Sequence, residues 1–405
     1  MPLLLRLLVS EEDLIPLLLG FTAVNGDLRL YTQYLSSLCH NGRGGSRRVA
    51  CRFLEHMATV KEPLLALEKL SKELGGSGAL LNEIVRSLRL GVEPAEVAER
   101  LVERIIARVR AKAELVDDIA KAMLEVLALV STVLTFSILM SGFLLGGGAG
   151  IQLAAFILAG IVGLAAMFTP SVVRLSAPRV PRIVTVTTIA SMISGVYSIY
   201  AHSLLAALIS TVLSLPAILY TARWWRQTRS VASIAVGIAE SLQMGRGIPP
   251  LGAGDPSLTY SILMGSKYSV YSNLGELLVD MLRLIPQEGS VTAAKLLRSF
   301  TEFAARYLEL VKTALTKSIV YETIVVIAMP LLALLAKQVL GVMNTATVAN
   351  APIPLLRTGL HGGKELSMML LPAVAYPLAT SKIGRGTPLL PLLHWLPSLL
   401  AVVLL

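Results

Sequence analysis

The sequence predicts an all-α protein that crosses a membrane about seven times, with two helical-bundle domains on one side of it. Of its 405 residues, 54% are hydrophobic and the mean hydropathy is +0.70, whereas soluble domains are roughly 45–50% apolar. Several apolar stretches reach the roughly 20 residues that a helix needs to cross a bilayer. Between them lie two long charged stretches whose apolar residues recur with helical period.

These stretches divide the chain into five predicted parts. They are an N-terminal amphipathic segment (1–26), a first cytoplasmic helical domain (27–121), a four-span membrane block (122–222), a second cytoplasmic helical domain (223–317) and a three-span membrane block (318–405). The second domain organises the chain, because it is too polar for a bilayer and too long for a connecting loop of roughly 2–8 residues.

The expected spans differ in strength. They are Ala122–Leu145, Ile151–Val173, Ile183–Ala201, Ser203–Ala222, Ser318–Val342, Leu366–Thr380 and Pro388–Leu405. The pair 183–201 and 203–222 should form a hairpin with a tight turn near His202, and 344–364 should be a loop. The span that begins at Leu366 is the weakest, since it is short and contains two prolines.

The basic residues predict how the chain is oriented. Lys and Arg accumulate on the cytoplasmic side of membrane proteins, and the net charge here is +10. Basic clusters at 174–182, 223–229 and 382–385 all fall on the same side as both hydrophilic domains. We therefore expect a multi-pass protein of the cell membrane, with its N-terminus and both domains in the cytoplasm and its C-terminus outside. This topology accounts for the charge without nucleic-acid binding.

Residue patterns that would indicate catalysis or a cofactor are weak. Cys39 and Cys51 form no C-x-x-C pattern, so neither a zinc site nor a disulfide framework is expected. The stretch Gly359–Lys364 has the wrong spacing for a phosphate-binding loop and no Ser or Thr after its lysine. Lone histidines such as His202 and His394 are typical of packed or solvated groups. We therefore expect a protein that is not an enzyme and has no cofactor or metal.

Four charged residues stand at the mouths of two predicted spans, Lys121 and Glu125 at the first, Lys317 and Glu322 at the fifth. A carboxylate inside a membrane is costly, so both glutamates are expected within reach of water at the headgroups. Pairing of each glutamate with its lysine across one helical turn is the alternative.

The two hydrophilic domains resemble each other, which indicates an internal duplication. Glu114-Leu-Val116 precedes the first span as Glu309-Leu-Val311 precedes the fifth, and Phe53–Leu65 resembles Ile238–Leu251. Each of these upstream stretches is expected to form an amphipathic helix, followed by a short break and a proline that opens the next helix. This pattern, continued by Asn82–Val97, is similar to the cytoplasmic domain of the type II secretion F family. The additional membrane hairpins resemble the archaeal members or the related tight-adherence pilus proteins more than the simpler bacterial ones.

The resemblance implies a function. Members of this family are membrane platform proteins of type II secretion systems, type IV pili and archaeal flagella. It implies that the chain couples a cytoplasmic assembly ATPase to the insertion or extraction of pilin-like subunits, among membrane lipids and as a homodimer. A secondary transporter or permease is the alternative, and it would need polar or broken helices at mid-membrane.

A platform without chemistry of its own must act through contact surfaces. Charged helix faces that the core does not need are the candidates for binding the ATPase. These residues are Arg86, Arg89, Glu93, Glu96, Arg100, Arg246, Arg283 and Arg298.

Overall fold

A computed structural model describes most of the chain. The described residues are 9, 11–23, 28–41, 44–144, 157–164, 175–243, 272, 274–275, 277, 279, 290–350, 367 and 370–404. Across them the regular structure is helical, apart from one isolated β-bridge between Pro178 and Ser272. The predicted all-α class is confirmed for this part of the chain.

The chain divides into two compact units. Unit 1 comprises Met1–Ala111, Arg174–Pro178 and Trp224–Leu310, and unit 2 comprises Lys112–Val173, Arg179–Arg223 and Val311–Leu405. Three helices contribute residues to both units, namely α7 (Pro94–Leu144), α10 (Leu204–Gln243) and α13 (Ser290–Asn350). The predicted boundary at 222/223 therefore lies inside one uninterrupted helix, because the basic cluster at 223–229 contains no residue that ends a helix.

Unit 1 begins with a series of short helices. They are the 3₁₀ turn η1 (Glu11–Leu14) and the helices α2 (Ile15–Ala23), α3 (Leu28–Asn41), α4 (Gly44–Val60), α5 (Pro63–Leu74) and α6 (Gly78–Arg89). As expected, Pro63 and Pro94 open helices, where their missing N–H costs nothing. Gly75 and Gly91 adopt positive φ angles in the turns after α5 and α6, a conformation that glycine takes without strain.

Helix α2 corrects the prediction of an amphipathic N-terminal segment. Its sequence, IPLLLGFTA, is apolar on nearly every side, and a helix that is hydrophobic all round is buried. Leu17, Leu18 and Phe21 have no exposed surface, and the Phe21 ring lies 4.0 Å from that of Tyr31. Residues 14–21 are therefore part of the core of unit 1.

Unit 1 contains residues from both predicted hydrophilic domains. The hydroxyl of Tyr307 donates to Glu12 (3.1 Å) and accepts from the N–H of Leu175 (3.2 Å). Arg306 pairs with Glu103 at 3.7 Å. Residues 295 positions apart in the sequence thus share one packing unit.

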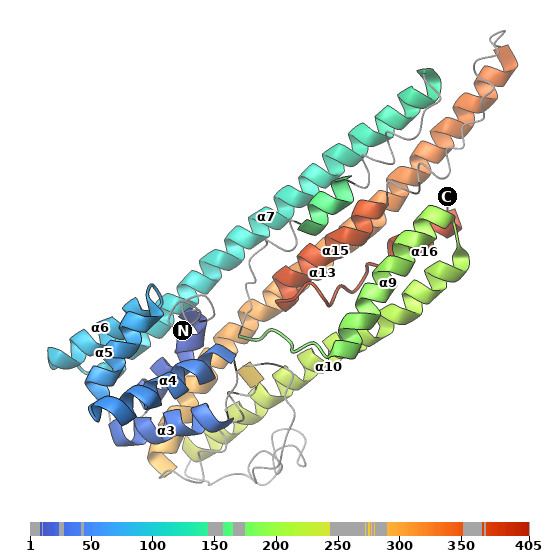
Figure 1. Ribbon diagram of the computed structural model, residues 1–405. Coiled ribbons are helices and arrows are strands. Elements are labelled where there is room, and N and C mark those ends of the chain that lie inside the picture. The colour runs from blue at the N-terminus through green and yellow to red at the C-terminus, as the bar shows by residue number, and fades with distance from the viewer. Residues whose placement is uncertain are drawn as a thin grey trace. The chain divides into compact units, whose positions relative to one another are not determined.

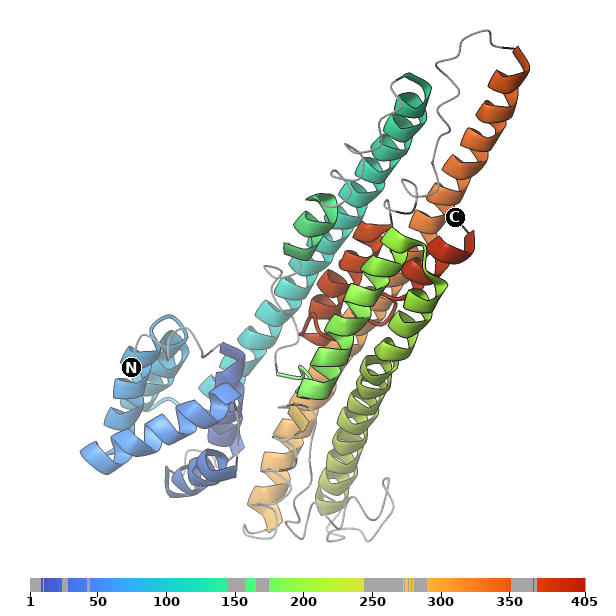
Figure 2. The ribbon, with the colours of Figure 1, turned by 45° about the vertical axis from the view of Figure 1, so that its right-hand side comes forward.

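Unit 2 contains the apolar helices. It includes α9 (Arg182–Ala201), α15 (Leu371–Arg385), α16 (Leu396–Leu404) and parts of the three long helices. Figures 1 and 2 show α9 beside the first half of α10. The predicted tight turn between them is confirmed, with His202 in the left-handed conformation (φ 48°).

Three described helical stretches are long and apolar enough to cross a bilayer, Arg182–Ala201, Leu204–Gly237 and Phe300–Val339. The first predicted span is helical through Leu144 in α7, and the second lies mostly outside the described residues. The length and composition of these three helices thus support membrane association.

The two last predicted spans are not continuous spanning helices. Helices α15 and α16 have 15 and 9 residues, or about 22 and 14 Å at 1.5 Å per residue. Between them the backbone is not helical, because Gly386 adopts a left-handed conformation and Pro388 and Pro391 follow. The predicted loop at 344–364 also begins later, since α13 continues to Asn350.

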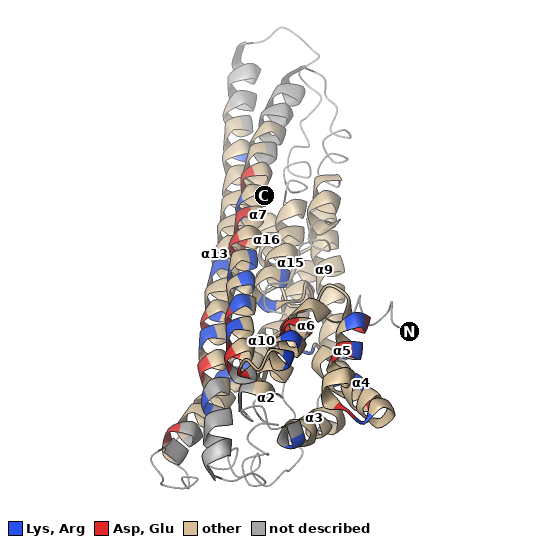
Figure 3. Ribbon diagram, turned by 90° about the vertical axis from the view of Figure 1, so that its left-hand side faces the viewer, with Lys and Arg blue, Asp and Glu red and all other residues tan. Residues whose placement is uncertain are grey.

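Charged side chains are distributed unevenly. Figure 3 shows acidic and basic residues gathered on α5, α6 and one stretch of each of α7 and α13, whereas most of α9 carries none. This contrast separates water-facing helices from those suited to lipid.

Candidate functional site

The most unusual feature of unit 2 is a completely buried ion pair. Nη1 of Arg385 lies 2.7 Å from Oε1 of Glu322, and neither side chain has any exposed surface. Charged groups inside membrane segments are rare and mark functional sites by default. The buried pair is therefore the candidate site.

Glu322 collects three donors from the C-terminal part of the chain. Besides Arg385, the hydroxyl of Thr380 donates to Oε1 (3.1 Å) and the backbone N–H of Leu392 donates to Oε2 (3.1 Å). Nη1 of Arg385 also donates to the carbonyl oxygen of Leu390 (2.9 Å). The carboxylate of Glu322 on α13 thus holds both α15 and the non-helical segment 386–395 in place through hydrogen bonds.

Side chains of neighbouring helices also bind backbone carbonyl groups of the segment 386–395. The hydroxyl of Ser381 donates to the carbonyl of Thr387 (2.7 Å), and that of Thr188 on α9 donates to the carbonyl of Leu389 (3.2 Å). Non-helical backbone at membrane depth is tolerated only where protein or enclosed water satisfies its polar groups. The hydroxyls and Glu322 do so here.

A glycine allows the ion pair to form. A Cβ atom at Gly384 would lie 2.5 Å from Cβ of Ser318 and 3.0 Å from the carbonyl oxygen of Ala314. Ser318 is one helical turn before Glu322 on α13, so α15 approaches α13 closely at this point. Because the next residue is Arg385, the close approach brings its guanidinium to the carboxylate.

Both alternatives expected for Glu322, placement at the membrane interface and pairing with Lys317, are wrong. Glu322 is enclosed and pairs with Arg385, and Nζ of Lys317 lies 2.8 Å from Oδ2 of Asp117 on α7. Glu125 is exposed, and Nζ of Lys121 also lies 3.0 Å from Oδ2 of Asp117. The sequence could not show that both lysines meet at one aspartate.

Asp117 is the second buried carboxylate of unit 2, with 8% of its side chain exposed. Burial raises its pKa, but hydrogen bonds from Lys317, Tyr321 and Lys121 outweigh this and lower it to about 2. The hydroxyl of Tyr321 donates to Oδ1 at 2.7 Å. Asp117 therefore stays ionised and joins α7 to α13.

A third polar group surrounds His394, which is fully buried. Its Nε2 lies 2.8 Å from the hydroxyl of Ser191 on α9, and that hydroxyl also lies 2.7 Å from the carbonyl of Ser210 on α10. Ser210 in turn donates to the carbonyl of Ser191 (2.8 Å). Small polar residues of this kind hold helices together in membranes, so His394 is packed, as expected. His202 contacts the hydroxyl of Ser367 at 3.0 Å.

Three of the described arginines that are predicted to bind partners form separate ion pairs. Arg89 pairs with Glu68 (2.5 Å), Arg100 with Glu96 (3.6 Å) and Arg298 with Glu302 (2.9 Å). Arg86 and Glu93 are exposed. Arg246 and Arg283 lie outside the described residues. Exposed pairs of this kind contribute little to stability.

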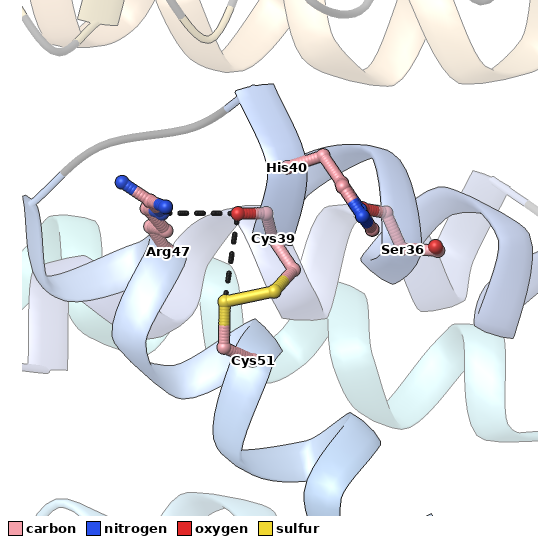
Figure 4. The surroundings of a disulfide bond; sticks show 5 residues. All are labelled: Ser36, Cys39, His40, Arg47 and Cys51. Atoms are coloured by element: carbon pink, nitrogen blue, oxygen red, sulfur yellow. Dashed lines mark hydrogen bonds between the residues drawn. A yellow bond between two sulfur atoms is a disulfide. The ribbon is translucent and has the colours of Figure 1, made fainter.

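Cys39 and Cys51 form a disulfide, which the sequence did not predict. It links α3 to α4 with a sulfur–sulfur distance of 2.01 Å (Figure 4). The guanidinium of Arg47 donates to the carbonyl of Cys39 (3.0 Å). The prediction failed because spacing alone does not show that two helices will fold back on each other. Disulfides are uncommon in most cytosols but occur in the intracellular proteins of hyperthermophiles.

A pocket of about 70 Å³ in unit 1 is lined by residues of α2, α7 and α13. Its lining includes apolar residues such as Val102 and Phe303 and the carboxylates of Glu99, Glu103 and Glu302. In the part of the chain that the structure describes, no group of three His, Cys, Asp or Glu residues could hold a metal ion. The predicted phosphate-loop lookalike at 359–364 lies outside that part.

Comparisons with known proteins do not place the chain in a family. No protein-family model matches it, and neither a curated protein nor a solved structure does. The function must be argued from the chain itself.

Sequence reasoning missed Arg385 and Asp117 as members of the buried groups. A signal for Arg385 existed, since Lys382 and Arg385 are the basic residues of an otherwise apolar tail with no Asp or Glu after position 366. No sequence signal singled out Asp117, because several charged residues surround it in the sequence.

Proposed function

We propose that the chain is a membrane platform protein of a type IV pilus, archaellum or type II secretion-like machine. It would couple a cytoplasmic assembly ATPase to the movement of pilin-like subunits. The similarity of 50–145 and 231–342 to the type II secretion F family supports this proposal.

The observation that carries it is the continuity of α7 and α13. With 51 and 61 residues, they extend about 77 and 92 Å at 1.5 Å per residue. Each runs from a charged stretch into an apolar stretch of the sequence without interruption. A continuous helix transmits a displacement along its axis, which is the mechanical task of a platform.

Recovery of the tagged full-length protein from its own cells tests the proposal. An assembly ATPase and pilin-like subunits should come down with it, in amounts that fall with salt if charged rims steer the contact. Recovery of neither protein under mild conditions contradicts the platform function.

A helix-breaking variant tests the coupling. Glu114 is exposed on α7, so Glu114→Pro should interrupt the helix at a cost of about 3 kcal/mol while leaving surface contacts in place. We expect ATPase binding to persist and fibre assembly to fail. Glu114→Ala is the matched control and should assemble normally. Normal assembly by the proline variant would contradict force transmission through α7.

A secondary transporter is the second candidate, and the buried ion pair is the observation that favours it. Transporters bind substrates where broken helices meet charged groups inside the membrane, and Glu322 faces such a break at 386–395. Uptake of a labelled substrate by reconstituted vesicles, abolished in Glu322→Gln, would favour this function over the platform.

A further inference from the structure

The pocket of unit 1 combines two kinds of side chain. Its apolar lining residues include Leu19, Val102 and Phe303, which are only 4%, 5% and 3% exposed. Its carboxylates are open to water, and the side chains of Glu103 and Glu302 are 61% and 55% exposed. The pocket thus offers an ionised group in water and, next to it, an apolar contact away from water.

The sequence of α7 places both kinds of residue side by side. Residues four apart lie on the same face of a helix, so Glu99 and Glu103 form one row, and Val102 and Ile106 form the next. All four line the pocket. Carboxylates one helical turn apart repel each other, and a cation bound between them removes this cost.

The charges of the pocket leave a negative balance. Glu103 pairs with Arg306 at 3.7 Å, and Glu302 pairs with Arg298 at 2.9 Å. Glu99 makes no ion pair or hydrogen bond within the part of the chain that the structure describes. Three carboxylates are thus matched by two guanidinium groups, and one further positive charge balances the set.

The other arginines of this stretch of α7 have carboxylate partners elsewhere. These pairs are Arg100–Glu96, Arg104–Glu83 and Arg108–Glu11. None of these residues lines the pocket, so they do not supply the missing charge.

The size of the pocket indicates which cation fits. A volume of about 70 Å³ holds the end of one side chain, whereas small-molecule sites measure roughly 300–1,000 Å³. A metal ion is not indicated, because among the described residues no group of three His, Cys, Asp or Glu could hold one. An arginine side chain fits, because its stem is apolar and its guanidinium is always charged and binds carboxylates with a planar fork.

We propose that this pocket binds one arginine side chain of a partner protein. The stem lies against Val102 and Phe303, and the guanidinium binds the carboxylates of Glu99 and Glu103. Arginine is among the residues that most often anchor one protein on another. The inference does not depend on the platform function or on transport, since it concerns binding at unit 1 alone.

The probe is a pentapeptide of alanine with one central arginine, blocked at both ends. Its reference carries citrulline, the uncharged isostere of arginine, at the centre. Saturation-transfer nuclear magnetic resonance measures the dissociation constants of both peptides for the full-length protein in phosphatidylcholine nanodiscs, with empty nanodiscs as the blank. Hydrogen bonds between charged groups are the strong ones, so we expect the arginine peptide to bind at least about tenfold more tightly.

Variants locate the binding site. Glu99→Gln with Glu103→Gln should weaken binding of the arginine peptide by about tenfold. Glu96→Gln removes the same charge from an exposed residue of α7 that does not line the pocket, and should leave binding unchanged. Exposed changes of this kind usually spare folding, which the melting temperature checks.

Equal binding of the arginine and citrulline peptides would overturn the proposal on the wild-type protein alone. Equal losses in the Glu96 variant and in the double variant would also overturn it, because attraction would then be general to the acidic surface. Butylguanidinium, the side chain without its backbone, should bind no more tightly than the peptide. Tighter binding of butylguanidinium would assign the pocket to a free small cation and refute docking of a protein.

Discussion

Both units contain Arg–Glu ion pairs, but the surroundings of these pairs are opposite. In unit 1 the ion pairs are open to water, as in Arg104–Glu83, whose side chains are 48% and 44% exposed. In unit 2 the pair Arg385–Glu322 is fully enclosed. Water screens the first kind and competes with it, so each contributes about 0–1 kcal/mol. The second kind is costly to desolvate and far more costly to break.

The difference shows that a charged residue must be judged by its surroundings. Unit 1 combines an apolar core, a disulfide and exposed ion pairs with two buried carboxylates, Glu12 and Asp13. Unit 2 presents many apolar side chains on its surface and keeps polar groups inside, which is the arrangement that a bilayer requires.

The largest effect should come from breaking the buried pair. Glu322→Ala leaves Arg385 buried and uncompensated, and should destabilise unit 2 by about 3–5 kcal/mol. Glu83→Ala, the counterpart in unit 1, should change stability by less than about 0.5 kcal/mol. Unfolding by denaturant in nanodiscs measures both. Replacing both partners, as Glu322→Leu with Arg385→Met, should recover most of the loss. Equal effects of the two alanine variants would contradict the comparison.

Removal of the disulfide should have the next largest effect, now in unit 1. It closes a loop with a sequence separation of 12, for which chain entropy predicts about 3 kcal/mol. Cys39→Ser should therefore lower the melting temperature of unit 1, and a reducing agent should lower that of the wild type equally. A reducing agent that also affects the Cys39→Ser variant would point to another cause.

Filling the contact at Gly384 tests the geometry behind the buried pair. Gly384→Ala forces Cβ against Ser318 and Ala314, and overpacking of this kind costs about 1–3 kcal/mol. Gly341→Ala in α13 meets no atom within 4 Å and is the matched control. Thermal unfolding of the two variants should separate them clearly, and equal melting temperatures would refute the close approach of α15 and α13.

The smallest effect should be the acid sensitivity due to Asp117. Its pKa is lowered from 3.8 to about 2 in the folded protein, so it stabilises the fold above pH 4 and loses this contribution as the pH falls toward 2. Asp117→Asn should cost about 2 kcal/mol at neutral pH. The variant should also lose less stability than the wild type between pH 4 and pH 2. Parallel pH profiles for the two proteins would contradict the assignment.

The sequence by itself determined the helical class, the starts of α5 and α7 at prolines, and the turn at His202. These features depend on neighbouring residues, since proline and glycine restrict or free the backbone locally. The long apolar stretches of α9, α10 and α13 are equally visible, because hydropathy and helical length are properties of a single segment. The duplication and the platform function remain predictions.

Tertiary structure alone decided which groups meet. Glu125 and Glu322 look alike in sequence, each near the mouth of an apolar stretch, yet one is exposed and the other fully buried. The partner of Glu322 lies 63 residues away, and the contact depends on Gly384 and on the break after α15. Likewise, Lys317 finds Asp117 across a separation of 200 residues. Pairing over such distances depends on how helices pack, which the local pattern of a sequence does not contain.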